Sequence, residues 1–401
     1  MKLSNLIKPR DGIHGISRYK GGKGSQAIGA IKLSSNESPL GPSDKAIKAY
    51  IDSAKSLSIY PDGNSTLLKE KIAELHNINV NNIICGAGSD EILNLIACAY
   101  LMPGDEVIYS EHAFLLYKII TLTNNGTPIA AKEVGLKANI DNIISCVTKK
   151  TKIVFIANPN NPTGSYLNKN ELYELRDRLP ERVLLVIDGA YAEYAQEEDY
   201  IDGKSLISET VNTVMTRTFS KVYALAALRI GWAYAPLHII EVLNKIRGPF
   251  NLSTAAINAG AAAIEDHDHV TKSVELNSNE KVQLLKAYEE AQIHVHGGAA
   301  NFLLLDLTNL AKKTSTMQQE MVVSLNNYLI KNNIFVRNVS DYGLQCHLRV
   351  TIGSKEQNRT VLDKIREFMW IRIHLHKYYS FYVKTLAEQL NENIFLEQQG
   401  T

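Results

Sequence analysis

Between about residues 80 and 235, short apolar runs alternate with amphipathic stretches. Strands are predicted for IICG (83–86), EVIYS (106–110), KIVFIANP (152–159), RVLLVID (182–188) and TVMTRTF (213–219). Two of these runs contain the nearly continuous apolar segments IVFI and VLLVI, which are typical of strands buried on both faces. Helices are predicted between the strands at 90–101, 114–124 and 168–179. This alternation predicts an α/β fold with a mainly parallel sheet covered by helices.

The pattern changes in the C-terminal part of the chain. Residues 254–292 favour one or two long helices. They are followed by a strand-like NFLLLDL (301–307), a helix near 316–332, and short strands in IFVRN (334–338) and HLRVTIG (347–353). This order predicts a smaller α+β domain beside the large one. The predicted parts are an N-terminal arm at 1–45 that joins the small domain, a large domain at 46–290, a small domain at 291–368 and an atypical tail at 369–401.

Composition narrows the classes of partner. The 401 residues are 45% hydrophobic and 21% charged, which is typical of a globular protein with a sizeable core. The 43 Lys and Arg residues nearly balance the 42 Asp and Glu residues, so nothing indicates a nucleic acid or an anionic membrane as partner. The longest mainly apolar stretch, Ile92 to Met102, is too short to span a bilayer, and the N-terminus has no apolar core of signal-peptide length. We therefore expect a cytoplasmic protein.

No metal site is predicted. The four cysteines, Cys85, Cys98, Cys146 and Cys346, have no metal-ligand spacing, and their separation fits a reducing compartment. The two histidines of EDHDH (265–269) are expected to lie at a solvated helix junction.

Four polar segments each follow a predicted strand: GAGSDEI (86–92), ANPNNPTG (157–164), DGAY (188–191) and TFSK (218–221). Taken singly, each has an ordinary explanation as a helix cap, a turn, a strand end or a surface lysine. In open α/β sheets, however, ligands bind at the carboxyl ends of the strands. Together the four segments therefore predict one ligand site at that edge.

The residue types in these segments suit pyridoxal 5′-phosphate. This cofactor needs a lysine for a Schiff base with its aldehyde and an acid that keeps its pyridine nitrogen protonated. Lys221 can supply the first and Asp188 the second. Tyr191 and Asn161 can donate hydrogen bonds to the phenolate oxygen of the ring.

The same segments predict a place for the cofactor phosphate. Thr218 and Ser220 offer hydroxyl groups, and Arg229, eight residues after the lysine, offers a guanidinium. The predicted helix that begins at Ser89 and Asp90 offers backbone N–H groups, which bind anions at helix N-termini.

These motifs resemble those of fold-type-I pyridoxal-phosphate aminotransferases. Over about residues 10–366 the chain is similar to the histidinol-phosphate aminotransferase branch of that family. The similar segments are LSSNESPLGP (33–42), YPDG (60–63), RTFSK (217–221), LRIGWAYA (228–235), NFLLLD (301–306) and VRN (336–338) with LRVTIG (348–353). The resemblance implies a homodimer with active sites at its interface. It also implies amino-group exchange between L-histidinol phosphate and 2-oxoglutarate, giving imidazole-acetol phosphate and L-glutamate in histidine biosynthesis.

The resemblance implies roles at the cofactor. Lys221 would carry the Schiff base and move a proton at the substrate, and Asp188 would pair with the pyridinium. Phe114 would stack on the ring, and the GSDE segment adds Glu91 to the cofactor-binding residues. Tyr60 would reach the cofactor phosphate of the partner subunit.

The resemblance also implies a substrate end of the site. Arg349 would hold the α-carboxylate of the amino donor, and together with Arg337 it would receive the phosphate of histidinol phosphate. Tyr19 and Asn36 in the N-terminal arm would form part of the substrate wall.

The chain departs from the family pattern at two positions. Gly189 stands where many members have glutamate after the aspartate, although the spacing from Asp188 to Tyr191 is kept. His112 lies in EHAF, where many members have Pro-Thr-aromatic, and we expect it to be a polar residue at a strand end rather than a substrate contact.

Other functions stay open at this point. An aromatic-amino-acid transaminase would accept a flat ring of similar bulk. A pyridoxal-phosphate-dependent phospho-amino-acid decarboxylase or lyase would share the cofactor site and differ in which Cα bond is broken. A non-catalytic module that binds the cofactor or an amino acid is the remaining alternative, and the intact Lys221 argues against it.

Overall fold

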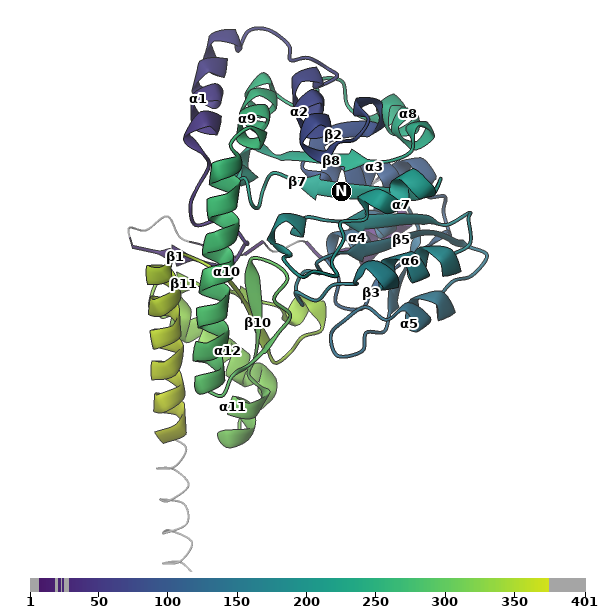
Figure 1. The fold of residues 1–401 in the computed structure, drawn as a ribbon. Helices are drawn as coiled ribbons and strands as arrows, with labels where there is room; N and C mark the ends of the chain where they lie inside the picture. The colour runs from purple at the N-terminus through teal and green to yellow at the C-terminus, as the bar shows by residue number, and fades with distance from the viewer. Residues whose placement is uncertain (1–6, 19–20, 23, 25–28, 375–401) are drawn as a thin grey trace, which may run out of the picture.

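The computed structural model describes residues 7–18, 21–22, 24 and 29–374 (Figure 1). Within these residues the largest sheet has seven strands in the order β2-β8-β7-β6-β5-β3-β4. The strands are β2 Ile83–Ala87, β3 Glu106–Ser110, β4 Thr127–Ala131, β5 Thr151–Ala157, β6 Leu184–Asp188, β7 Thr213–Thr218 and β8 Ile230–Tyr234. Only β8 runs antiparallel to its neighbours, β2 and β7. The predicted mainly parallel sheet and its five predicted strands are confirmed.

Two strands of this sheet were not predicted. β4 contains a proline and alternates weakly between apolar and polar residues. β8 follows β7 after only residues 219–229, which contain no helix longer than the three-residue 3₁₀ turn η6 (Ala226–Leu228). A parallel strand needs a longer crossover, usually with a helix, so this short connection returns antiparallel.

Helices cover both faces of the sheet. They are α1 Asp44–Asp52, α2 Thr66–His76, α3 Ser89–Tyr100, α4 Leu116–Thr123, α5 Ile140–Ser145, α6 Lys169–Arg178, α7 Lys204–Glu209, α8 Leu237–Ile246 and α9 Thr254–Ile264. Alternate residues of β5 enter different cores. Phe155 packs with α3, α4 and α8, whereas Val154 and Ile156 pack with α5 and α6. The apolar runs therefore belong to strands buried on both faces, as predicted.

The helix signals in the sequence correspond to real ends. α6 begins with a capping box, in which Asn168 accepts from the Glu171 amide and the Glu171 carboxylate accepts from the Asn168 amide. The predicted helical region at 254–292 is divided into α9 and the 24-residue α10 (His267–Glu290). In Figure 1, α10 runs from the large sheet down to the second, smaller group of elements.

The smaller group is built on a four-stranded antiparallel sheet in the order β12-β13-β10-β9. Its strands are β9 His294–His296, β10 Phe302–Asp306, β12 Arg337–Asn338 and β13 His347–Thr351. Helices α11 (Thr308–Lys313) and α12 (Gln318–Lys331) and a helix over residues 355–374 pack beside it. That last helix continues past the predicted boundary at 368, and the remainder of the predicted tail lies outside the described residues.

The N-terminal arm reaches this smaller group through a short strand. β1 (Ile31–Lys32) pairs in parallel with β11 (Ile334–Phe335). The residues directly after β1 then pass over the C-terminal edge of the large sheet, where Ser35 and Asn36 contact side chains from the loop after β7 and from the loop after β6.

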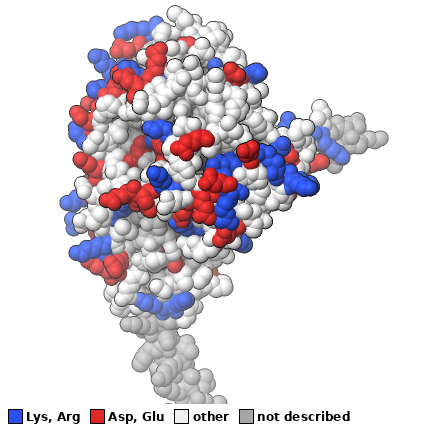
Figure 2. All heavy atoms as spheres, turned by 45° about the vertical axis from the view of Figure 1, so that its right-hand side comes forward, with Lys and Arg blue, Asp and Glu red and all other residues white. Residues whose placement is uncertain are grey.

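The surface agrees with the balanced charge. On the face in Figure 2, Lys and Arg side chains are interspersed with Asp and Glu side chains. Among the described residues, no helix combines the length and the apolar character needed to cross a membrane.

Candidate active site

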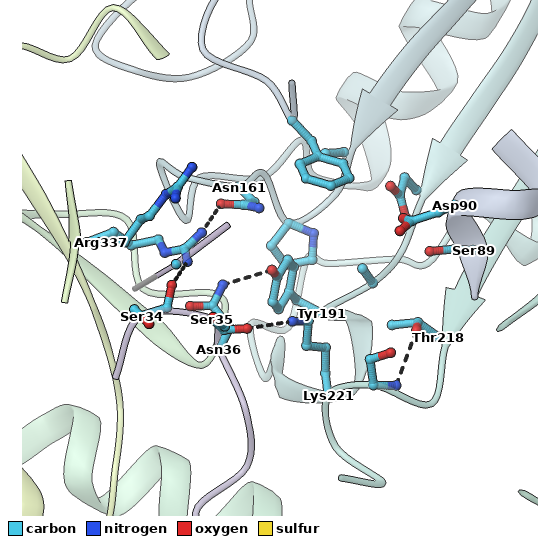
Figure 3. Close-up of a pocket in the computed structure, with 18 of the residues that line it drawn as sticks. Ser34, Ser35, Asn36, Ser89, Asp90, Asn161, Tyr191, Thr218, Lys221 and Arg337 are labelled. Carbon is cyan, nitrogen blue, oxygen red and sulfur yellow. Dashed lines mark hydrogen bonds between the residues drawn. The ribbon is translucent and has the colours of Figure 1, made fainter. Parts of the chain in front are cut away.

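The carboxyl ends of the central strands open into a cavity between the large sheet, the N-terminal arm and the small sheet. In Figure 3, Arg337 lies at one end of the cavity, Ser89, Asp90 and Thr218 lie at the other, and Tyr191 and Lys221 lie between them. The cavity is lined by most of the predicted site residues, namely Asn36, Ser89, Asp90, Phe114, Asn161, Asp188, Tyr191, Thr218, Ser220, Lys221, Arg229, Arg337 and Arg349.

Asp188 is the last residue of β6, and its side chain is buried. The Tyr117 hydroxyl donates to Oδ2 at 2.8 Å, and the Thr216 hydroxyl donates to Oδ1 at 3.1 Å. Burial raises the pKa of Asp188 to about 6, even though both hydrogen bonds favour the ionised form. The carboxylate is therefore held in one orientation, and a cation placed against it would offset the cost of burying its charge.

Lys221 follows β7, and its half-buried side chain enters the cavity. Its Nζ donates to the Ser35 carbonyl oxygen at 3.0 Å and lies 5.6 Å from the centre of the Tyr191 ring. Burial, and then the positive charge of Arg349, lower the pKa of Lys221 to about 8. A substantial fraction of this amine is neutral near pH 8, as a nucleophile or a proton acceptor requires.

Tyr191 and Asn36 form a buried polar pair beside the lysine. Asn36 Nδ2 donates to the Tyr191 hydroxyl at 2.9 Å, and the Thr351 hydroxyl donates to Asn36 Oδ1 at 3.0 Å. Burial raises the pKa of Tyr191 to about 12, so its hydroxyl keeps its proton and can donate to a ligand oxygen. The arm thereby positions a phenol of the large domain.

One end of the cavity has the groups of an anion site. The Arg229 guanidinium donates to Ser220 Oγ and to Asp90 Oδ2, both at 3.2 Å. A Cβ added at Gly88 would lie 2.5 Å from Arg229 Nη2, and one added at Gly231 would lie 2.1 Å from the Ser89 amide nitrogen. Glycine at both positions therefore lets the start of α3, strand β8 and the guanidinium converge. Free N–H groups, hydroxyls and a guanidinium together suit a phosphate dianion.

The opposite end holds two buried arginines on the small sheet. Arg337 on β12 and Arg349 on β13 are register partners. Arg349 donates from Nη2 to the Ser34 carbonyl oxygen at 2.8 Å and from Nη1 to Asn161 Oδ1. These bonds orient its planar group, and paired guanidiniums suit carboxylate or phosphate ligands.

Two predicted site residues in the described part of the chain, Glu91 and Tyr60, do not line this cavity. The Glu91 carboxylate accepts from the Ala87 amide and from Asn251 Nδ2, so it braces the loop before α3. Tyr60 is 80% exposed and stacks on Phe250, with ring centres 4.8 Å apart. Tyr19 lies outside the described residues.

The two departures from the family pattern have structural explanations. A Cβ at Gly189 would approach Arg217 Cδ at 3.1 Å and the Thr216 carbonyl oxygen at 3.2 Å. Arg217 is buried there in ion pairs with Glu193 and Asp202, so a side chain at position 189 would press on this network. His112 Nδ1 lies 2.7 Å from the Tyr342 carbonyl oxygen and is not part of the cavity lining.

Sequence reasoning missed several residues of the site. Tyr117 follows Phe114 by three residues within the predicted helix 114–124, a spacing that could have indicated a shared face. Thr216 lies two residues before Thr218 on β7, on the same face of that strand. Ser35 contributes its backbone carbonyl, which any residue would supply, so its identity carries no signal.

Known proteins resemble the chain over most of its length. The family model described as "Aminotransferase class I and II" matches residues 28–365. A histidinol-phosphate aminotransferase of Nitrobacter winogradskyi is 44% identical over 364 residues, covering 90% of this chain and 98% of that protein. A histidinol-phosphate aminotransferase of Rhodopseudomonas palustris is 43% identical over 364 residues, which again cover 90% of this chain and 98% of that protein.

Solved structures resemble the fold. The histidinol-phosphate aminotransferase of Sinorhizobium meliloti, in complex with pyridoxal-5′-phosphate, superposes with a TM-score of 0.78 at 24% identity, over 85% of this chain and 90% of that one. The histidinol-phosphate aminotransferase of Clostridium acetobutylicum superposes with a TM-score of 0.75 at 21% identity, over 84% of this chain and 99% of that one. The predicted fold type is confirmed by these likenesses.

Proposed function

The chain belongs to the aminotransferase class I and II family, and from this premise we propose that it exchanges an amino group between L-histidinol phosphate and 2-oxoglutarate, with pyridoxal 5′-phosphate as cofactor. The observation that carries the proposal is the order of groups in one cavity. A phosphate cradle, the pair Lys221 and Tyr191, and an arginine end follow one another along the cavity, and Asp188 lines the same cavity. The relatives that share over 40% of the sequence bear the name of this activity.

The residues present fit this cofactor. The glycines at 88 and 231 let the start of α3 and the Arg229 guanidinium converge at the cradle. Asp188 matches a protonated ring nitrogen, and Phe114 lines the same cavity. When bound, pyridoxal phosphate withdraws electrons from the Cα of the substrate and carries the amino group from one substrate to the next. The products are imidazole-acetol phosphate and L-glutamate.

Lys221 has two tasks in this proposal. Its neutral amine, favoured by burial and by the Arg349 charge, would bind the cofactor aldehyde in the resting enzyme. After displacement by the substrate it would remove a proton from Cα and later return one. Nζ donates a hydrogen bond to the Ser35 carbonyl oxygen at 3.0 Å, which restricts the conformations of the Lys221 side chain in the cavity.

Asp188 would hold the ring nitrogen in its protonated state. Its pKa is raised by burial, and an adjacent pyridinium would favour the ionised carboxylate again. Tyr117 and Thr216 orient the two carboxylate oxygens. Tyr191 and Asn161 would donate to the phenolate oxygen on the same side of the cavity as Asn36.

Arg349 and Arg337 would bind the substrate anions. The α-carboxylate of glutamate and the phosphate of histidinol phosphate would occupy this end in alternate half-reactions, because a planar guanidinium pairs with either. Asn161 and the Ser34 carbonyl already fix the Arg349 plane, so little side-chain freedom would be lost on binding.

The proposal includes a homodimer. Large apolar side chains are exposed on α1, in the loop that follows η3 (Ser53–Ser56) and at the Tyr60 stack, namely Ile47, Tyr50, Ile51, Leu57, Ile59, Tyr60 and Phe250. Such a patch is typical of a protein–protein contact. It would let Tyr60 reach the phosphate cradle of the partner subunit. All four cysteines are free thiols, which supports the proposed cytoplasmic location.

A substrate comparison on the cofactor-loaded enzyme tests the function. The values of kcat/KM for histidinol phosphate, phenylalanine and threonine phosphate would be measured, with 2-oxoglutarate as acceptor and CO₂ release as a parallel readout. We expect histidinol phosphate to exceed the others by at least about tenfold, the value of one well-placed charged contact. A preference for phenylalanine would instead identify an aromatic-amino-acid transaminase, and CO₂ from threonine phosphate a decarboxylase.

A further inference from the structure

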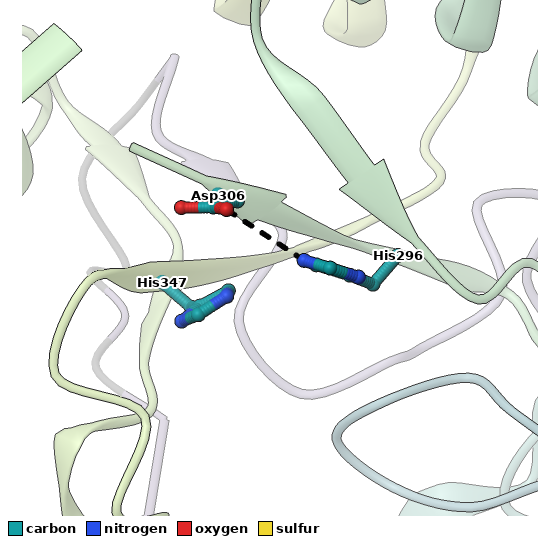
Figure 4. Close-up of side chains that lie close together, drawn as sticks. All are labelled: His296, Asp306 and His347. Atoms are coloured by element: carbon teal, nitrogen blue, oxygen red, sulfur yellow. Dashed lines mark ion pairs between the residues drawn. The ribbon is translucent and has the colours of Figure 1, made fainter. Parts of the chain in front are cut away.

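A second polar cluster lies on the small sheet, apart from the residues that line the cavity. It contains His296, Asp306 and His347, and Figure 4 shows their side chains facing one another. One nitrogen or oxygen atom from each lies within 4.8 Å of the other two, and His296 Nε2 is 3.7 Å from Asp306 Oδ2. Three neighbouring strands, β9, β10 and β13, therefore bring two imidazoles and one carboxylate together.

The strand register explains this convergence. Asp306 is directly opposite His347 on β13, and Leu304, two residues earlier, is opposite His296 on β9 and Arg349 on β13. Side chains two residues apart project from the same face of a strand. The cluster therefore shares a sheet face with Arg349: His296 lies in the same row of residues as Arg349, and Asp306 and His347 lie in the next row.

His347 is the least satisfied member of the cluster. Both of its ring nitrogens are buried, and neither has a hydrogen-bond partner among the described residues. Buried polar atoms are nearly always paired, so two unpaired nitrogens on one ring need an explanation. Asp306 is already oriented, because its Oδ1 accepts from the Thr308 amide at 2.8 Å while Oδ2 faces His296.

We propose that His296, Asp306 and His347 bind one divalent transition-metal ion, of the kind represented by Zn²⁺ or Co²⁺. Two imidazoles and a carboxylate form a donor set that such ions prefer. Tetrahedral bonds of about 2.0–2.1 Å would bring the donor atoms to roughly 3.4 Å from one another. Binding would therefore draw the three donor atoms closer together than they are at present.

The surroundings suit an exchangeable ion. The side chains of His296 and Asp306 are 24% and 21% exposed, which gives an ion a route from solvent and leaves a position for water. The ion would join β9, β10 and β13, so its binding would stabilise the sheet that carries Arg349. This proposal does not rest on the proposed function, because Lys221, Asp188 and the cradle lie outside the cluster.

No motif in the sequence indicated this site, and the prediction of no metal concerned the cysteines and EDHDH (265–269). The cluster residues are ten and forty-one positions apart along the chain. No short metal-binding spacing unites them, and only the pairing of β10 with β9 and β13 brings them together.

The test uses the full-length, cofactor-loaded enzyme without a histidine tag, treated with a chelator and dialysed. Titration with Co²⁺ would be followed through its visible d–d absorption, and Zn²⁺ would then be added as a competitor. We expect one Co²⁺ per chain, displaced by Zn²⁺. His296→Gln, Asp306→Asn and His347→Gln should each weaken binding by at least about tenfold.

His267→Gln is the matched control, since His267 is an exposed histidine in the acidic stretch that lies outside the cluster. Its affinity for Co²⁺ should equal that of the wild type. Absence of d–d bands at millimolar Co²⁺, or equal binding by wild type and cluster variants, would overturn the proposal. Should His347→Gln fail to fold, His296→Gln and Asp306→Asn decide the matter, because both side chains are partly exposed.

Discussion

The two ends of the cavity are assembled in different ways. At the cradle and ring end, Asp188, Thr218 and Lys221 sit at or directly after the carboxyl ends of adjacent strands of one sheet. At the arginine end, Arg349 donates to the Ser34 carbonyl, and these two residues are 315 positions apart along the chain. The first end follows from local motifs on a sheet edge, whereas the second exists only when the arm packs against the small sheet.

This difference suggests a division of work. Residues at the sheet edge would determine whether the cofactor is held and whether protons move. Residues from the arm and the small sheet would determine which anion is bound. If the division is real, variants at one end should change cofactor retention and turnover, and variants at the other should change KM.

The largest effect is expected for Lys221→Ala. Without this amine the enzyme lacks both its covalent attachment and its proton carrier, so turnover should fall by about 10⁴-fold or more. The visible absorption of the bound cofactor should change at the same time, and the two would be measured on one sample. Lys245→Ala, an exposed lysine on α8, is the control and should be unchanged. Substantial turnover by Lys221→Ala would refute the assignment of the cofactor end.

Asp188 should give the cofactor-free protein an unusual pH dependence. Its pKa is 3.8 in the reference state and about 6 when folded, because burial disfavours the charge. The folded state therefore binds this proton more tightly, and the free energy of unfolding should decrease as pH rises from about 4 to 6. A shift of this size corresponds to roughly 3 kcal/mol, present as a cost above the folded pKa.

Denaturant unfolding of the cofactor-free wild type and of Asp188→Asn at pH 4.5 and 7 measures this cost. Asp188→Asn should lack the cost of ionising the buried carboxyl. Its free energy of unfolding should therefore decrease less than that of the wild type between pH 4.5 and pH 7. Lys221 does not interfere, since its folded pKa of about 8 lies above this window. Asp363→Asn, at an exposed position, is the control. Parallel pH profiles for wild type and Asp188→Asn would show that Asp188 carries no such cost.

Arg349→Lys tests the other end. A lysine keeps the charge but cannot reproduce the planar contacts to Ser34 and Asn161, so KM for glutamate should rise by roughly 10–100-fold. The absorption of the bound cofactor should stay close to that of the wild type. Arg337→Lys is the comparison, and it should affect KM for histidinol phosphate more than KM for glutamate. Loss of cofactor from Arg349→Lys would mean that the two ends do not act separately.

The same division explains what the sequence could reveal. The five predicted strands are present, and Lys221, Asp188 and Arg229 line one cavity. Both could be predicted because burial on both faces and strand-end motifs are local properties. Ser35 could not be found, since its contribution is a backbone carbonyl placed by the arm. The histidine cluster was hidden for a related reason, because the register of three strands creates it.

Strand direction was likewise beyond the sequence pattern. The run LRIGWAYA (228–235) contains β8, and its direction could not be predicted, because a buried strand shows the same apolar run whichever way it points. Its antiparallel course matters for the site, since it brings Gly231 within contact distance of the first amide of α3.

Tyr117 is the missed residue that allows the finest test. It donates to Asp188 Oδ2 at 2.8 Å, and its ring stacks on Phe155 with centres 4.8 Å apart. Tyr117→Phe removes the hydrogen bond and keeps the stack, so kcat/KM should fall by only about tenfold. Because that bond lowers the pKa of Asp188, its loss should raise this pKa. The decrease in cofactor affinity at low pH, called here the acid limb, should then begin at a higher pH.

The matched control is Tyr109→Phe. The centre of the Tyr109 ring lies 6.5 Å from that of Tyr117, and Tyr109 does not line the cavity. The Tyr109→Phe variant should leave both kcat/KM and the acid limb of the cofactor-affinity profile unchanged. A fall in kcat/KM for Tyr117→Phe with an unmoved acid limb would assign Tyr117 to packing alone. A shift of the acid limb would show that the cofactor end of the cavity depends on the Tyr117 hydroxyl from helix α4, although its main residues come from local motifs at the sheet edge.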